Sequence, residues 1–83
     1  MRLPRDLSWE ELVKALSRLE YVVTRQTGSH LRLTTQRKGE HHVTIPRHPS
    51  LRVGTLSAIL NDVAAHVGMS RQELLEHLFG PQR

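Results

Sequence analysis

The sequence predicts a small α+β domain in which a three-stranded antiparallel sheet is covered on one face by helices. Two observations lead to this prediction. Apolar residues recur at helical spacing toward both ends of the chain, and they alternate with polar residues in its middle. The expected order is a helix, three strands, a second helix and a C-terminal helix, and such segregated elements are typical of the α+β class.

The first helix is expected to start at Trp9. Ser8 and Glu11 have the spacing of a capping box, in which each side chain accepts a hydrogen bond from the backbone of the other residue. The apolar positions of this segment form one stripe: Leu12, Val13, Leu16 and Leu19. The helix should therefore be amphipathic and cover an apolar surface.

Three strands are expected between residues 21 and 46. The first, over residues 21–24, is rich in β-branched residues and leads into a turn over residues 26–29. The second and third alternate apolar and polar residues and are joined across residues 36–39. Since neighbours in a strand project to opposite faces, one polar set should point away from the helices. This set is His30, Arg32, Thr34, His42 and Thr44.

Two further helices are expected after the sheet, which should stop at Pro46 because proline cannot donate to a strand ladder. One should run from near Thr55 to Gly68, and the other should follow a capping box of Ser70 and Glu73. The last helix carries an apolar patch before Gly80 and Pro81: Leu74, Leu75, Leu78 and Phe79.

Length and composition place the chain among single small domains. Its 83 residues leave room for one domain over residues 1–83, which buries only about 60% of its unfolded surface. Without cysteine, neither a disulfide nor a thiolate metal site can contribute. No segment has the pattern of a signal peptide or a membrane span, so a cytoplasmic location is expected.

The net charge of +4 is concentrated in the middle of the chain. Between Arg25 and Arg52 there are six lysines and arginines against one acid, Glu40. This asymmetry suits a polyanionic partner, although a solvated basic face is an equally open interpretation. Aromatic side chains are few, which favours recognition of an RNA backbone over stacking of bases on the sheet.

His30 is the main candidate for chemistry. It follows Gly28 and Ser29 at the start of a strand, on the exposed face, beside a glycine turn that lets another backbone approach. Cleavage of a phosphodiester without a metal needs a group that takes a proton from the ribose 2′-OH, and histidine can do this near neutral pH. Taken alone, however, the tripeptide is more often an ordinary turn with a surface histidine.

An anion site is expected at the start of the second helix. Arg47, His48 and Arg52 precede it, and the free N–H groups and positive dipole end of a helix favour an anion. Gly54 permits close approach and Thr55 can cap or donate, while a plain helix cap is the alternative. A metal site at His41 and His42, or at a cross-strand pair of His30 and His42, lacks a third ligand and is not favoured.

These segments resemble the HicA (YcfA-like) family of small toxins, through Gly28-Ser29-His30, the run from Ile45 to Pro49, and Gly54-Thr55-Leu56. The resemblance extends from about Leu7 to Phe79. It implies a double-stranded-RNA-binding-domain-like fold and a type II toxin that cleaves mRNA independently of the ribosome, without a cofactor or metal. It also implies catalysis by His30 and a HicB-type antitoxin as partner. The residues assigned to RNA binding are Ser29, Arg32, Arg47, His48, Arg52, Gly54 and Thr55.

Two other functions remain open from the residues. One is a non-catalytic RNA-binding module in which the basic strip holds phosphates and His30 only donates a hydrogen bond. The other is a protein-interaction subunit that recruits a partner through Leu75, Leu78 and Phe79.

Overall fold

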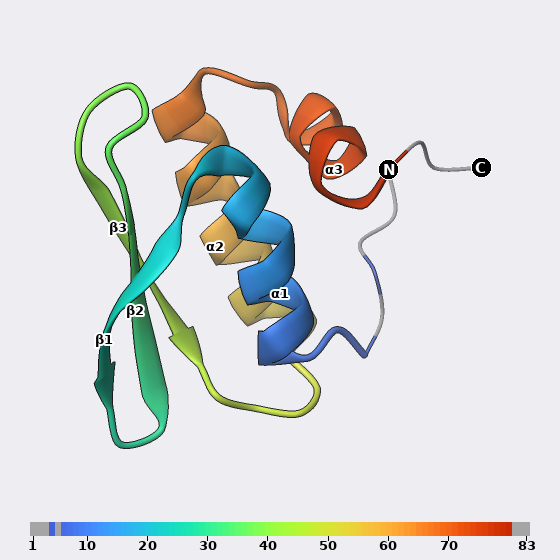
Figure 1. Ribbon diagram of the computed structural model, residues 1–83. Helices are drawn as coiled ribbons and strands as arrows, with labels where there is room; N and C mark the ends of the chain where they lie inside the picture. The colour runs from blue at the N-terminus through green and yellow to red at the C-terminus, as the bar shows by residue number, and fades with distance from the viewer. Residues whose placement is uncertain (1–3, 5, 81–83) are drawn as a thin grey trace.

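The computed structural model describes residue 4 and residues 6–80 of the chain. The elements in these residues are α1 (Trp9–Leu16), a 3-10 turn η1 (Ser17–Leu19), β1 (Val22–Thr27), β2 (His30–Thr35), β3 (His41–Pro46), α2 (Val53–Val67) and α3 (Arg71–Phe79). The strands form one antiparallel sheet in the order β1-β2-β3. The helices all lie on one side of it (Figure 1), which confirms the predicted α+β class. Pro81, expected after the last helix, lies outside the described residues.

The helix boundaries follow the capping chemistry. Both predicted capping boxes are present, with the Ser8 and Ser70 hydroxyls accepting from the N–H groups three residues on. Gly68 ends α2 in the left-handed conformation, with φ of 74°. The start of α2 differs from the prediction, because Arg52 is the cap residue and the helix begins at Val53. Thr55 is therefore inside the first turn and does not cap it.

The β1–β2 turn is tighter than predicted. Gln26 and Thr27 were expected in the turn, but they pair with Leu31 and His30 as part of β1. The connection has only two residues, and Gly28 adopts a positive φ of 53°. A two-residue hairpin turn needs such a backbone at its first central position, which glycine supplies without steric cost.

A β-bulge interrupts β1. Val23 pairs with Leu33, but Arg25 pairs with Arg32, so the register shifts around Thr24. A bulge places two residues of one strand opposite one residue of its partner and redirects the side chains that follow. As a result Thr24 and Arg25 both lie on the face of the sheet that points away from the helices, hereafter the open face.

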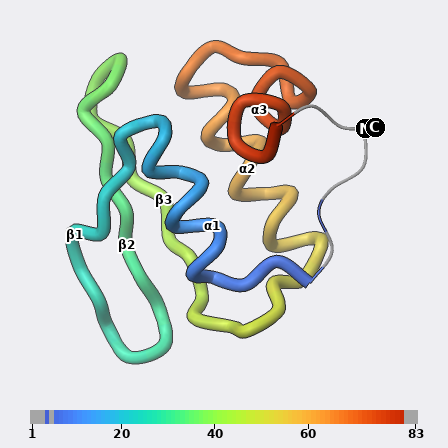
Figure 2. Tube along the Cα trace, turned by 45° about the vertical axis from the view of Figure 1, so that its right-hand side comes forward, coloured from blue at the N-terminus to red at the C-terminus, as the bar shows by residue number. Residues whose placement is uncertain are grey.

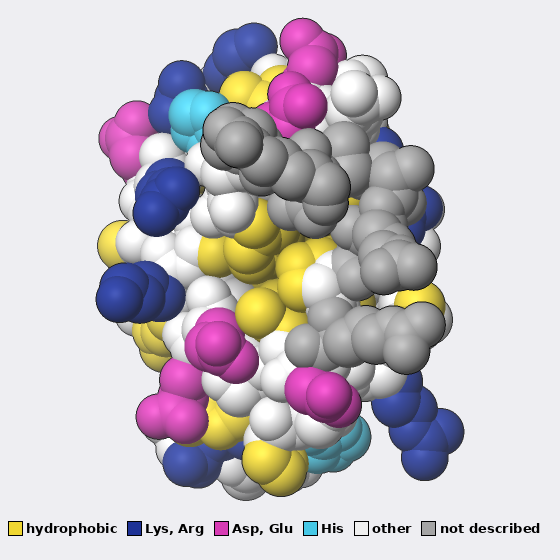
Figure 3. Space-filling model, turned by 90° about the vertical axis from the view of Figure 1, so that its right-hand side faces the viewer, with side chains coloured by type: hydrophobic (Ala, Val, Ile, Leu, Met, Phe, Trp, Pro, Cys, Tyr) yellow, Lys and Arg dark blue, Asp and Glu magenta, His cyan; other side chains and the backbone are white. Residues whose placement is uncertain are grey.

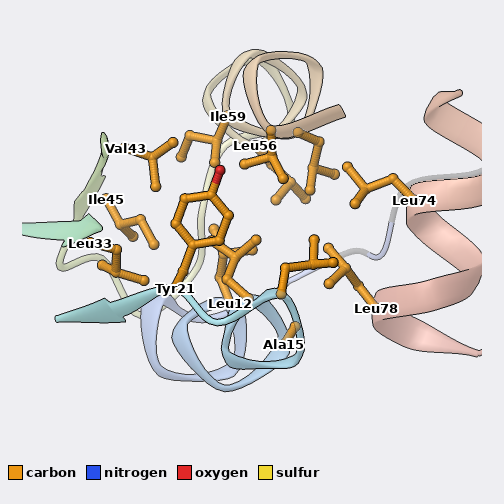
Figure 4. Packing of buried hydrophobic residues seen from close by; sticks show 14 of the residues in the cluster. Leu12, Ala15, Tyr21, Leu33, Val43, Ile45, Leu56, Ile59, Leu74 and Leu78 are labelled. Atoms are coloured by element: carbon orange, nitrogen blue, oxygen red, sulfur yellow. The ribbon is translucent and has the colours of Figure 1, made fainter. Parts of the chain in front are cut away.

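The core lies between the sheet and the helices. Tyr21, Leu33 and Ile45 from the sheet side are fully buried against Leu12 of α1 and Leu60 of α2. Figure 4 shows side chains from α3 completing the same cluster at its far end. Leu75 and Leu78 are buried at 0% and 2% exposure, so two of the three residues of the alternative interaction patch on α3 do not face a partner. Their helical spacing reflects packing on the core.

The other side of the molecule carries an apolar hollow between α1 and α3. Figure 3 shows hydrophobic side chains at its centre, with charged groups around them. Its lining consists of Leu7, Glu11, Lys14, Ala15, Arg18, Leu78 and Phe79. None of the helices in the described residues combines the length and the apolar character that crossing a membrane requires.

Candidate nucleic-acid interface

The fold brings the two predicted site motifs together at one end of the molecule. His30 opens β2 directly opposite Pro46, the last residue of β3. The Arg47 N–H then donates to the Ser29 carbonyl over 2.7 Å, which extends the pairing by one further contact. Figures 1 and 2 show the β1–β2 turn, the β3–α2 loop and the first turns of α1 and α2 at this same end. His30 and Arg47 are some 17 positions apart in the sequence, yet they belong to one surface.

His30 is held by its backbone and has a largely free ring. Its side chain is exposed, and its Nδ1 lies 3.3 Å from the Ser29 hydroxyl oxygen. The other ring nitrogen, Nε2, has no partner among the described residues. Ser29 therefore limits the rotation of the ring while Nε2 stays available to an incoming group.

Arg47 is positioned by Trp9, a role that sequence reasoning missed. The guanidinium carbon lies 5.1 Å from the centre of the indole ring, within the range of a cation–π contact. The Trp9 backbone N–H also donates to the His48 carbonyl over 3.2 Å. The Trp9 side chain also packs partly against the core. The cation–π contact depends on tertiary placement and leaves no signal in sequence spacing.

The first turn of α2 lies open beside this loop. It has no side-chain cap and no acidic residue, in contrast to α1, whose first turn carries Glu10 and Glu11. Arg52 and His48 are exposed next to it. Gly54 is exposed too, and a side chain there would meet no atom within 4 Å. Free N–H groups in the first turn of a helix favour an anion, so the anion site expected at this helix start stays a prediction.

The open face next to His30 is polar and hollowed. One hollow is lined by Arg25, Thr27, His30, Leu31, Arg32, His42 and Thr44. All but Leu31 stand on the open face, where Arg32 was predicted to lie. The sheet thus extends the candidate surface away from the β1–β2 turn.

His42 is fixed within this face by a chain of hydrogen bonds. Its Nδ1 lies 2.7 Å from the Thr34 hydroxyl and its Nε2 lies 2.8 Å from a Glu40 carboxylate oxygen. The Thr34 hydroxyl is in turn 2.8 Å from that of Thr24 in the bulge. His42 faces Thr34 in the register, so it is not the cross-strand partner of His30 that was considered above. No group of three potential metal ligands occurs in the part of the chain that the structure describes.

A second histidine cluster, on the helix side, was not foreseen. His41 stacks on His66 of α2 at 4.3 Å, and its Nε2 lies 3.2 Å from Asp62. The buried Tyr21 hydroxyl lies 2.7 Å from His41 Nδ1. Burial, with a smaller effect of Asp62, raises the pKa of Tyr21 to about 12, so the hydroxyl keeps its proton at neutral pH. This cluster joins the sheet to α2 and contributes to structure.

An antiparallel sheet of three strands, covered on one face by helices in the order α-β-β-β-α, is the double-stranded-RNA-binding-domain-like arrangement. In this chain the sheet carries an exposed histidine beside a basic loop, the combination that the sequence analysis singled out. The sequence model of the HicA toxin of bacterial toxin–antitoxin systems matches residues 9–64, from the start of α1 into α2. The match covers more than half of the chain and includes both site motifs, so the chain belongs to the HicA toxin family. No curated protein and no solved structure matches it.

Proposed function

We propose that this HicA-family toxin is an endoribonuclease that cleaves mRNA, independently of the ribosome and of metal ions, with His30 as its catalytic residue. The observation that supports this best is the joining of the two motifs by the Arg47–Ser29 hydrogen bond. It brings the exposed His30 next to the loop that carries Arg47 and leads to the open start of α2. A general base, a cation and backbone N–H donors are groups that promote cleavage of a phosphodiester.

In this mechanism His30 acts as a general base through Nε2. It takes the proton of a ribose 2′-OH, and the resulting oxygen attacks the adjacent phosphorus. The bond from phosphorus to the 5′ oxygen breaks, the leaving oxygen takes up a proton from water, and a 2′,3′-cyclic phosphate remains. His30 then releases the proton that it took to the solvent. Arg47 and the first turn of α2 stabilise the charge on the phosphate, while Ser29 orients the ring.

The remaining assignments concern binding and partners. Arg32, His48 and Arg52 contact the RNA backbone, with Gly54 and Thr55 at the helix start allowing close approach of a phosphate. Family membership implies a cognate antitoxin. We assign it to the HicB type and place the complex in the cytoplasm.

The test is incubation of a labelled RNA with the purified chain in EDTA at near-neutral pH. His30→Ala should lower the cleavage rate by roughly 100-fold or more, the usual contribution of a general base. His77→Ala, which removes an exposed histidine from α3, is the matched control and should cleave normally. Unchanged cleavage by His30→Ala would refute the catalytic assignment, and loss of cleavage in EDTA that magnesium, manganese or zinc restores would refute the metal-free mechanism.

Binding measurements separate the enzyme from a non-catalytic RNA-binding module. On the enzyme proposal, His30→Ala retains salt-dependent RNA binding, whereas Arg47→Ala and Arg52→Ala weaken binding similarly for all base sequences. Salt-dependent binding by every variant with no scission by any would favour the RNA-binding module. A change in base preference for Arg47→Ala would contradict its role as a phosphate contact.

A further inference from the structure

We propose that Arg25 and Arg32 form a second phosphate-binding subsite on the open face of the sheet, so that the RNA strand crosses this face from His30. This inference rests on the proposed function, because it assigns the path of the same substrate. It adds Arg25, which the predicted site did not include, and it gives the substrate a defined path across the sheet.

The first support is the bulge in β1. Strict alternation from Val22 onward would put Arg25 on the side of the core. The shift around Thr24 instead brings Arg25 opposite Arg32, and both line the hollow that also contains His30. The Thr24 hydroxyl is hydrogen-bonded to Thr34 over 2.8 Å, which fixes the bulge in place. Bulges commonly redirect a side chain next to a functional site.

The second support is unbalanced charge. Like charges directly opposite each other across two strands destabilise a sheet. Within the described residues, the ion pairs are Arg37 with Glu20, His41 with Asp62 and His42 with Glu40. Glu40 is the only acid between positions 25 and 52, and His42 already occupies it. The two arginines therefore face each other without a carboxylate, an arrangement that an anion between them would relieve.

The third support is spacing. Arg32 lies two residues after His30 on the same face of β2, which corresponds to roughly 6.6 Å along a strand. This is comparable to the separation of neighbouring phosphates in an extended RNA strand. Thr27 and Thr44 stand beside these residues and offer hydroxyl donors. A scissile phosphate at His30 thus places the next phosphate at the arginine pair.

The experiment measures binding of a labelled single-stranded RNA oligonucleotide to the full chain by fluorescence anisotropy, in EDTA and over a range of salt. All variants carry His30→Ala, so that cleavage does not interfere. Arg25→Gln and Arg32→Gln should each weaken binding about threefold or more at low salt. Each should also reduce the slope of log K against log salt by about 0.7, the value for one lost phosphate contact. Arg25→Lys should retain most of the slope.

Arg18→Gln is the matched control, because Arg18 is exposed and lines the hollow between α1 and α3. It should leave both affinity and slope unchanged. If Arg25→Gln and Arg32→Gln bind like the control while Arg47→Ala binds weakly, the subsite is refuted and the proposed function stands. If the parent chain itself does not bind RNA, both the subsite and the proposed function are refuted. Binding of poly-glutamate, an acidic polypeptide, is measured in the same way. If Arg25→Gln and Arg32→Gln lose binding to poly-glutamate but bind RNA normally, the arginine pair contacts a protein and the proposed RNA path is refuted.

Discussion

At the scale of single residues, Tyr21 shows how a buried polar group makes the fold sensitive to pH. Its ring is fully buried, and its hydroxyl contacts His41, which in turn contacts Asp62. Replacing it by phenylalanine keeps the packing and removes only this hydrogen bond. Tyr21→Phe should therefore lower the free energy of unfolding at neutral pH by about 1 kcal/mol.

The same substitution has a pH dependence with a definite sign. The pKa of Tyr21 is about 12 in the folded chain, against 10.0 as its ordinary value. Below pH 10 the phenol is protonated in both the folded and the unfolded chain, and its full contribution to the free energy of unfolding is present. This contribution is lost as the pH rises from 10 toward 12, because the unfolded chain releases the proton first. The stability advantage of the parent chain over Tyr21→Phe should therefore shrink across this interval, as urea unfolding at pH 7, 9 and 11 would measure. An advantage that stays constant would contradict the raised pKa. Tyr21 is the only tyrosine, so no other phenol contributes.

At the scale of elements, the capping box of α3 supports a short helix of nine residues. The Ser70 hydroxyl accepts from the Glu73 N–H over 3.1 Å, and the Glu73 carboxylate accepts from the Ser70 N–H over 2.9 Å. These hydrogen bonds lower the pKa of Glu73. Ser70→Ala should lower the free energy of unfolding by about 1 kcal/mol, the usual cost of losing such a cap.

Ser70→Asp provides the control, because aspartate caps a helix as well as serine does. Thermal unfolding followed by circular dichroism should place it close to the parent, with Ser70→Ala melting lower. Equal melting of Ser70→Ala and the parent would show that packing of Leu74 and Leu78 alone holds α3. RNA cleavage should be unaffected by either substitution, since α3 lies away from the candidate interface (Figure 1).

At the scale of the whole molecule, the shared core predicts one cooperative unit over the chain. Leu60 has 0% exposure and belongs to a single cluster that joins the sheet to the helices. Leu60→Ala should cost roughly 2–5 kcal/mol and shift the urea midpoint strongly in a domain of this size. Trp9 fluorescence and far-UV circular dichroism should report coincident transitions in both proteins. Separate transitions would contradict the single domain.

The sequence predicted the architecture because local signals determine it. Ser8 and Ser70 mark helix starts, Gly68 marks a helix end, and alternation in β2 assigns the faces of the sheet. The start of α2 and the ends of the β1–β2 turn were missed by one or two residues, whereas the other missed features depend on tertiary contacts. The bulge at Thr24, the Trp9–Arg47 contact and the stack of His41 on His66 have no sequence period. An interaction role for Leu75 stayed open in the sequence because an apolar helix stripe looks the same whether it faces the core or a partner.

The order of the strands in the sheet has a consequence for how quickly the toxin forms. Each strand pairs with its neighbour in the chain, and the β1–β2 connection has only two residues. Hairpins of this kind close in about 1–10 μs, because little chain entropy is lost before the first contacts form. His30 lies at that connection, so its local setting assembles among the earliest parts of the chain. The core that stabilises this hairpin includes residues of α2, which are synthesised later. The candidate site is therefore complete only after α2 has packed against the sheet.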